Sequence, residues 1–368
     1  MAASREIKVV VSDLHLGTGT MRGRVNPYED FHQDDRFAEL VRHYTNGEYR
    51  DRPVEIIING DFLDLLKVPY KGAFVTEVTE EVSLDKVRRC IKGHPAVFDA
   101  LAEFVKEPGH RLTYIAGNHD LDVAFKRVQA LILARIGVDR ADDRVSFLTD
   151  QEFYRLPGGV VITHGHTFEE INRTEEGTPL KTLDDGRRVV NMPWGSLFFS
   201  TVLAPIKAER PIIDLVHPLS SFILWSLVFD LRFTLKILWN MTSFFVSTRL
   251  KAIYRRQMDI IKTLQILGEE IAFYNNLERR ASRLLRSADE ITALIVGHTH
   301  AAGVRRYPRN KVYVNTGTWV QTVSLDLRDL GTANRLTYAE VDYANIGPPA
   351  VRLMRWRGVM RKCEELLV

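Results

Sequence analysis

The chain has 368 residues, of which 45% are hydrophobic and 26% charged, and its formal net charge at pH 7 is +3. This length allows one large domain or two medium ones with a substantial core. The small net charge does not favour a nucleic-acid-binding protein, and we expect no nucleic acid among its partners. The two cysteines, Cys90 and Cys363, match no disulfide or zinc spacing, which fits a reducing compartment.

The N-terminal region has no basic segment followed by a long apolar stretch and a cleavage site. Residues 1–6 lead directly into the apolar run at 7–11. This pattern predicts no secretory signal, and we expect a cytoplasmic protein.

Short apolar runs alternate with segments of helical spacing along much of the chain. Each run is short and mostly apolar, which is typical of strands covered on both faces. In chain order the sequence predicts a strand at 7–12, a helix at 35–44, a strand at 54–59, a helical segment at 84–105, a strand at 112–116, a helix at 123–136, and strands at 160–163, 291–296 and 311–315. This alternation predicts a layered α/β domain.

The composition changes between Trp194 and about Arg256, where Phe, Trp, Leu and Ile crowd together but are interrupted by charged residues and proline. The longest clean apolar run, at 219–229, is about half the roughly 20 residues that a spanning helix needs. We therefore expect no transmembrane helix here. Residues 200–260 contain eight basic and four acidic side chains, a net charge of +4.

Two interpretations of this apolar segment stay open on composition alone. Apolar, aromatic and basic residues together are typical of an amphipathic element that lies on an anionic membrane surface. A helical insertion that packs on the parent domain, or against a second copy in a homodimer, has the same composition.

Five polar motifs follow the predicted strands, at the point where each apolar run ends. In open α/β sheets, ligands bind beyond the carboxyl ends of the strands, so we expect these motifs to lie at a site. The last motif places two imidazoles two residues apart, pointing the same way on an extended backbone. The motifs are Asp13-Leu-His15, Gly60-Asp61, Gly117-Asn118-His119-Asp120, His164-Gly-His166 and Gly297-His298-Thr-His300.

The side chains of these motifs favour a metal site. Carboxylate, amide oxygen and neutral imidazole are ligands for divalent ions such as Mn, Fe, Co, Ni or Zn. One aspartate can bridge two cations, and two cations about 3.5–4 Å apart can polarise a phosphoryl group and lower the pKa of a bound water. The five motifs together therefore indicate a two-metal centre for phosphoryl chemistry.

The same five motifs, in the same order, resemble the calcineurin-like metallophosphoesterase superfamily. The resemblance spans Val9 to about Trp319, apart from the apolar segment. It implies a four-layer α/β/β/α sandwich with a dinuclear metal site at one edge of the β layers. It also implies a metal-dependent hydrolase of phosphoric esters or anhydrides, with two divalent ions, manganese first and Fe, Zn, Co or Ni as alternatives.

The resemblance also implies roles for individual residues. His119 would stabilise the charge that develops on the phosphate or protonate the leaving oxygen, and Asp120 would orient His119. Asn59, Asp64 and the turn at 315–319 resemble accessory positions that support the metal loops. The implied metal ligands are Asp13, His15 and His300 for one ion, Asn118, His164 and His298 for the other, and Asp61 as the bridge.

Within the superfamily, the phrases at 12–16, 59–64 and 297–300 look most like UDP-2,3-diacylglucosamine hydrolases. Those enzymes cleave a nucleotide–lipid pyrophosphate at the inner face of the bacterial membrane and carry a helical lid between the fourth and fifth motifs. This resemblance implies an amphiphilic, lipid-linked substrate and a peripheral position on the cell membrane. That subfamily usually has arginine where this chain has His119, which keeps open a soluble phosphodiesterase or phosphatase for nucleotides or small phosphoesters.

The resemblance suggests three substrate contacts and a domain division. His166, Phe222 and Trp225 are the candidates for substrate binding. The expected divisions are a first part of the core at 1–193, a helical insertion or lid at 194–288, a second part of the core at 289–345, and a C-terminal strand or basic tail at 346–368.

Overall fold

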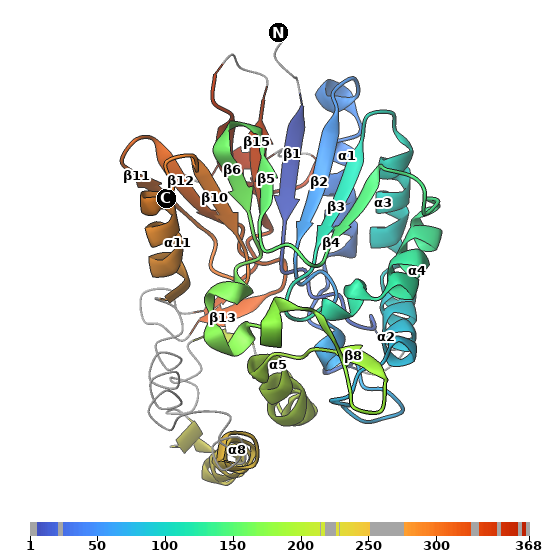
Figure 1. Cartoon of the computed structure of the whole chain (residues 1–368), viewed down its shortest axis with the longest axis vertical. Coiled ribbons are helices and arrows are strands. Elements are labelled where there is room, and N and C mark those ends of the chain that lie inside the picture. The colour runs from blue at the N-terminus through green and yellow to red at the C-terminus, as the bar shows by residue number, and fades with distance from the viewer. Residues whose placement is uncertain are drawn as a thin grey trace.

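Two main sheets, surrounded by helices, make up a mixed α/β fold (Figure 1). The computed structural model describes residues 6–20, 25–213, 215–217, 226–227, 229–250, 276–324, 331–343, 347–359 and 363–365. The predicted substrate contacts Phe222 and Trp225 lie outside the described residues.

The larger sheet has seven strands in the order β17-β16-β15-β1-β2-β3-β4. Strands β1 to β4 are mutually parallel, and β15 pairs antiparallel with β1. The parallel strands therefore all end at the same edge. The bounds are β1 Ile7–Val11, β2 Val54–Asn59, β3 Arg111–Ile115, β4 Val145–Leu148, β15 Thr337–Asp342, β16 Ala350–Trp356 and β17 Cys363–Glu365.

The second sheet has five strands in the order β11-β12-β10-β6-β5, in which β6, β10 and β12 are parallel. Its strands are β5 Tyr154–Leu156, β6 Val160–Ile162, β10 Ala293–Val296, β11 Gly303–Tyr307 and β12 Lys311–Asn315. Two small sheets add β7 Leu180–Thr182 with β8 Arg188–Val190, and β9 Val216–His217 with β13 Thr322–Ser324 and β14 Gly331–Ala333.

Alternating side chains of each main strand enter different apolar clusters. In β1, Val9 and Val11 pack with the helices, whereas Val10 faces the second sheet and packs in one cluster with Ile162 and Ile295. A strand buried on both faces favours apolar side chains at most positions, which explains the mostly apolar runs. The buried exceptions, Lys8 of β1 and Glu55 of β2, pair with each other. Figure 1 shows α3 and α4 beside one main sheet and α11 beside the other.

Two of the predicted helical segments differ from the structure. The helix predicted at 123–136 begins only at Lys126, after a 3-10 turn at Leu121–Ala124 and an extended Phe125. The segment 84–105 was expected to be helical throughout, but the structure has two helices that are separated at His94. Proline lacks a backbone N–H, so it cannot continue the preceding helix, but it is well tolerated as the first residue of a new one. The second helix accordingly begins at Pro95. The main helices are α1 Asp34–His43, α2 Glu80–Gly93, α3 Pro95–Lys106, α4 Lys126–Ile136 and α11 Asn276–Ser287.

The apolar segment begins with a short helix, a π-helical turn and another short helix, and it continues in a longer helix. These are α5 Trp194–Phe198, the turn Phe199–Leu203, α6 Ala204–Lys207 and α8 Leu231–Phe245. Val202, Ile206, Ile213, Phe233 and Ile237 form a separate buried cluster in this segment. Figure 1 shows α5 and α8 beyond the edge where the parallel strands end. None of the helices among the described residues is long and apolar enough to cross a membrane.

Candidate metal centre

The polar motifs lie in loops that continue the two sheets beyond their strands. The backbone N–H of Asp13 donates to the carbonyl of Gly60, and the N–H of Gly297 donates to the carbonyl of His164. The N–H of His298 donates to the Asp13 carboxylate, which joins the two sheets at this edge. The fold therefore brings together motifs that are almost 300 residues apart in the sequence.

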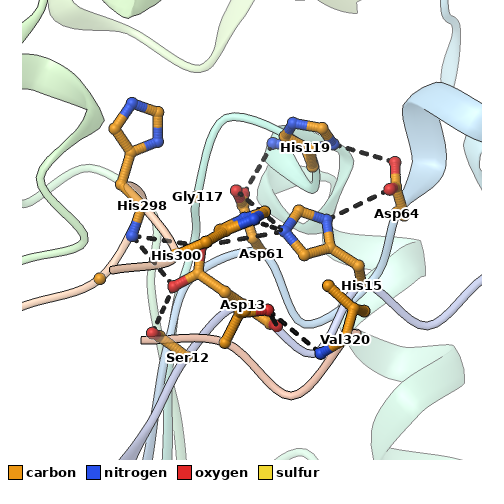
Figure 2. Close-up of polar contacts among 12 residues, drawn as sticks. Ser12, Asp13, His15, Asp61, Asp64, Gly117, His119, His298, His300 and Val320 are labelled. Atoms are coloured by element: carbon orange, nitrogen blue, oxygen red, sulfur yellow. Dashed lines mark hydrogen bonds and ion pairs between the residues drawn. The ribbon is translucent and has the colours of Figure 1, made fainter. Parts of the chain in front are cut away.

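The first group of candidate ligands consists of Asp13, His15 and His300 (Figure 2). The Nε2 atoms of His15 and His300 are 2.9 Å apart. The Oδ1 atom of Asp13 is 3.4 Å from Nε2 of His300 and 3.8 Å from Nε2 of His15. Two imidazole nitrogens and a carboxylate oxygen thus converge on one small region.

The second group consists of Asp61, His164 and His298. The Nδ1 of His164 is 2.8 Å from the carbonyl oxygen of Asn59, so its Nε2 is the nitrogen turned toward Asp61. That Nε2 lies 3.1 Å from Oδ2 of Asp61 without forming a hydrogen bond. The same Oδ2 is 3.9 Å from Nε2 of His15, so Asp61 lies between the two groups.

Buried polar atoms without hydrogen-bond partners also fit a metal centre. The Oδ1 of Asn118 is buried and has no hydrogen-bond partner among the described residues, and the buried Nε2 of His164 faces the Asp61 carboxylate at 3.1 Å without hydrogen-bond geometry. Such atoms are costly unless something satisfies them, and an amide oxygen and an imidazole nitrogen are both good ligands for divalent ions. Both atoms belong to the implied ligand set.

Backbone strain is concentrated at the candidate ligands. Ten non-glycine residues have a positive φ among the described part of the chain, and five of them are Asp13, His15, Asp61, His298 and His300. Non-glycine residues rarely adopt this backbone conformation, and such strain persists only where the surrounding structure imposes it. The fold therefore stabilises five unfavourable backbone conformations, and these conformations orient the five side chains.

Close contacts between carboxylates and imidazoles shift the pKa values of both kinds of side chain in the site. Burial raises the pKa of Asp13, but its contacts with His15 and His300 outweigh this and hold the pKa well below its usual range. Burial lowers the pKa of His164, but the negative charge of Asp61 outweighs it and raises the pKa to about 9. The carboxylates are therefore ionised at neutral pH, whereas an imidazole such as His164 binds a metal only after losing a proton.

Asp64 is the carboxylate that orients two histidines of the site. Its Oδ2 is 3.2 Å from Nδ1 of His15, and its Oδ1 is 2.9 Å from Nδ1 of His119. Figure 2 shows Asp64 facing both rings. These contacts leave the Nε2 atoms of both histidines for a metal or a substrate. Asp64 thus supports the loops of the candidate metal centre, as its resemblance to an accessory position implied.

Asp120 does not have the role that the sequence suggested for it. Its carboxylate accepts hydrogen bonds from the backbone N–H groups of Phe62 and Gly117 and from the hydroxyl of Tyr114, and it is wholly buried. Burial and the charge of Asp61 raise the pKa of Asp120 to about 6. Asp120 therefore ties two motif loops together, and the prediction that it orients His119 is wrong.

His166 is buried beside His164, with 5.3 Å between the ring centroids. Its Nδ1 has no hydrogen-bond partner among the described residues. Burial and the charges of His164 and His298 hold the pKa of His166 well below its usual value. His166 is therefore a neutral ring next to a candidate ligand, and its role in substrate binding stays a prediction.

Two residues that contact His298 were missed by sequence reasoning. Oε2 of Glu169 lies 2.9 Å from the Nε2 of His298, and the side-chain amide of Asn172 lies 3.3 Å from the same atom. Their one signal is that they follow the His164-Gly-His166 motif closely in a polar stretch. They hold the His298 ring as supporting residues do around metal-binding histidines.

A family model described as calcineurin-like phosphoesterase matches residues 9–226, more than half of the chain. The chain belongs to this family. The match ends before His298 and His300, which the fold brings to the calcineurin-like site through strand β10. No curated protein sequence matches the chain.

Several solved structures have low similarity to the chain. A dimetal phosphatase from Danio rerio is 12% identical over 98% of both chains, with a TM-score of 0.39. A predicted phosphoesterase from Streptococcus pneumoniae is 11% identical over 100% of this chain and 98% of its own, with a TM-score of 0.32. A 5'-nucleotidase from Candida albicans is 12% identical over 93% of this chain and 53% of its own, with a TM-score of 0.29. Membership of the calcineurin-like family rests on the family model.

Proposed function

We propose that this calcineurin-like protein is a dinuclear-metal hydrolase of a phosphodiester or pyrophosphate. The observation that carries the proposal is the position of Asp61 between two groups of candidate ligands, 3.9 Å from His15 and 3.1 Å from His164. A carboxylate there can bridge two cations and offset their mutual repulsion. The proposed ligands are Asp13, His15 and His300 for one ion, and Asn118, His164 and His298 for the other.

Each part of the site has a task in this proposal. Two divalent ions, manganese first, would polarise the phosphoryl oxygens and activate a water. His119 is partly exposed, with 14% of its side chain accessible, so it can reach a substrate. Asp64 holds the Nδ1 of His119, which directs Nε2 to the non-bridging or leaving oxygen of the phosphate.

Replacement of ligands tests the metal centre. Asp61→Ala or Asn118→Ala should deplete the metal and abolish turnover of bis(p-nitrophenyl) phosphate, because each removes an oxygen ligand. The exposed Asp150→Ala is the matched control and should keep both. Near-normal activity of either ligand variant would reject the assignment.

The finer fold and substrate are also part of the proposal. We infer a four-layer α/β/β/α sandwich in which residues 194–288 form a lid for an amphiphilic, lipid-linked substrate such as a UDP-diacylglucosamine-like molecule. Among the described residues, eight of the ten exposed large hydrophobic side chains lie in this segment. Four of them lie on one side of α8 at helical spacing and are named here the apolar face: Leu231, Leu235, Leu238 and Trp239.

An exposed apolar face of this kind supports contact with acyl chains or an anionic membrane surface. The same observation favours the second candidate, a phosphodiesterase or phosphatase for nucleotides or small phosphoesters whose apolar face is buried in a homodimer. The two candidates differ in what covers α8.

Substitution of the apolar face separates the two candidates. Leu235→Ser with Trp239→Ser should lower hydrolysis of a long-chain lipid phosphodiester in mixed micelles and leave hydrolysis of bis(p-nitrophenyl) phosphate unchanged. The exposed polar Thr242→Ser on the same helix is the control and should change neither. If the double variant instead converts a dimer to a monomer in sedimentation, and lipid has no effect, the dimer interpretation holds and the lipid substrate does not.

A further inference from the structure

A continuous series of buried ion pairs runs from helix α6 to the candidate metal centre. Lys207, the last residue of α6, is wholly buried, and its Nζ lies 3.0 Å from both carboxylate oxygens of Asp30. Asp30 also pairs with Lys67, whose Nζ is 2.8 Å from Oδ2 of Asp64. Asp64 in turn bonds the Nδ1 of His119. We name Lys207, Asp30, Lys67 and Asp64 the charge chain.

The alternating charges of the charge chain make its members dependent on one another. Each side chain is at least nine-tenths buried, so an unpaired charge anywhere in the series would be costly. Asp30 and Asp64 share Lys67, and Lys207 supplies the second cation for Asp30. If Lys207 were neutral, Asp30 would attract Lys67 more strongly and draw it away from Asp64. The position of Asp64, and with it the ring of His119, would change.

The same segment contacts the 117–120 motif directly. The hydroxyl of Ser196, in α5, donates to the backbone carbonyl of Asn118 at 3.1 Å. The ring of Phe199 packs edge-on against His119, with 5.2 Å between centroids, and Nζ of Lys67 lies 5.7 Å from the Phe199 centroid. The His119 ring is therefore held by Asp64 at Nδ1 and by Phe199 on another side.

We propose that Lys207 and Phe199 are positioning residues that orient His119 for catalysis, Lys207 through the charge chain and Phe199 by direct packing. This inference rests on the proposed function and deepens it, because it makes residues of the 194–288 segment part of the catalytic apparatus. The matched residues 9–226 include both positions, but neither belongs to the five motifs. The packing of the turn Phe199–Leu203 and of α6 then affects the rate of the chemical step.

A double-mutant cycle tests the proposal. Lys207→Met and Phe199→Leu are each made in the wild-type chain and in His119→Ala. In the wild-type chain, each should lower kcat on an alkyl phosphodiester by roughly tenfold, a part of the 10²–10⁴-fold that general acid catalysis supplies. KM and metal content should not change. In His119→Ala, the same substitutions should have almost no further effect on kcat, because the ring that they position is absent.

Two comparisons exclude a merely structural explanation. Lys236→Met is the matched control in the same segment, because Lys236 pairs with Glu209 at the surface with about half of each side chain exposed. It should leave kcat unchanged. The loss in Lys207→Met should also be larger for a poor alkyl leaving group than for p-nitrophenolate, which needs little protonation. Phe199→Leu changes no charge and keeps the test valid if Lys207→Met does not fold.

The outcomes distinguish this inference from the proposed function. Effects of Lys207→Met or Phe199→Leu that multiply undiminished with His119→Ala, or kcat values equal to wild type in both variants, would overturn the positioning role while leaving a metal-dependent hydrolase intact. A metal-loaded wild-type chain that hydrolyses no phosphoester would instead remove the proposed function itself.

Discussion

Gly117 lies directly against Asp61, so alanine at this position tests the proposed bridging carboxylate without replacing a ligand. A Cβ atom at Gly117 would be 2.1 Å from Oδ1 of Asp61 and 2.5 Å from its backbone nitrogen. Ordinary contacts of a Cβ begin at 3.4 Å, so Asp61 or the loop that contains Gly117 must move by about 1 Å. Gly117 has no positive φ, so alanine adds no backbone strain of its own.

The expected loss follows from this displacement. A misplacement of about 1 Å in a catalytic site costs about 100-fold in rate. This factor corresponds to about 2.7 kcal/mol in the activation free energy. Crowding of the core should lower the free energy of unfolding by about 1–3 kcal/mol. The assay is kcat/KM for bis(p-nitrophenyl) phosphate with saturating Mn²⁺, together with metal content by elemental analysis and the melting temperature.

Gly303→Ala is the matched control. A Cβ at Gly303, the first residue of β11, would meet no atom within 4 Å, and Gly303 has no positive φ. This variant should keep wild-type activity and metal content. Full activity and full metal content in Gly117→Ala would refute the reasoning, because Asp61 would then tolerate a displacement that a bridging ligand cannot.

Three further predictions concern metal, stability and pH. Removal of divalent ions with EDTA should abolish activity and added Mn²⁺ should restore it; activity that survives complete removal contradicts metal dependence. Asp120→Ala should lower the free energy of unfolding by about 3 kcal/mol, because buried donors lose their acceptor, and an unchanged urea midpoint would contradict this. Burial lowers the pKa of His94, but hydrogen bonds to Asp34 and Glu29 outweigh it and raise the pKa to about 9. This folded-state pKa exceeds the unfolded value, so the contribution of protonated His94 to the free energy of unfolding is complete below about pH 6.5 and is lost as the pH rises through 9. The free energies of unfolding of wild type and His94→Gln, measured by urea titration, should therefore converge above that pH.

Six strands of the two main sheets, and the place of the motifs that follow them, were predictable because both follow from burial. A strand covered on both faces reads as a short apolar run, and β1, β2 and β12 have the predicted cores. Parallel strands end at one edge, so polar motifs after them must be neighbours. The break between α2 and α3 was less evident from apolar spacing alone, because Val87 and Leu101 both lie on buried faces on either side of Pro95.

Supporting residues were less predictable than candidate ligands. Asp120 is adjacent to His119 in sequence, but its side chain turns into the core toward Tyr114. Asp64 reaches the ring from a different loop. Adjacent residues in an irregular loop can point in opposite directions, so sequence proximity does not determine which carboxylate contacts a histidine.

The sequence by itself determined the strands that precede the motifs, the edge at which they end and the kinds of side chain that gather there, since hydrophobic periodicity and motif chemistry are local properties. Only the tertiary structure decided which side chains face one another. The ion pair between Lys207 and Asp30 joins residues 177 positions apart, and nothing in either local sequence indicates the other. Such pairs depend on how whole elements pack, because a buried charge takes as partner whichever opposite charge the packed fold brings within reach.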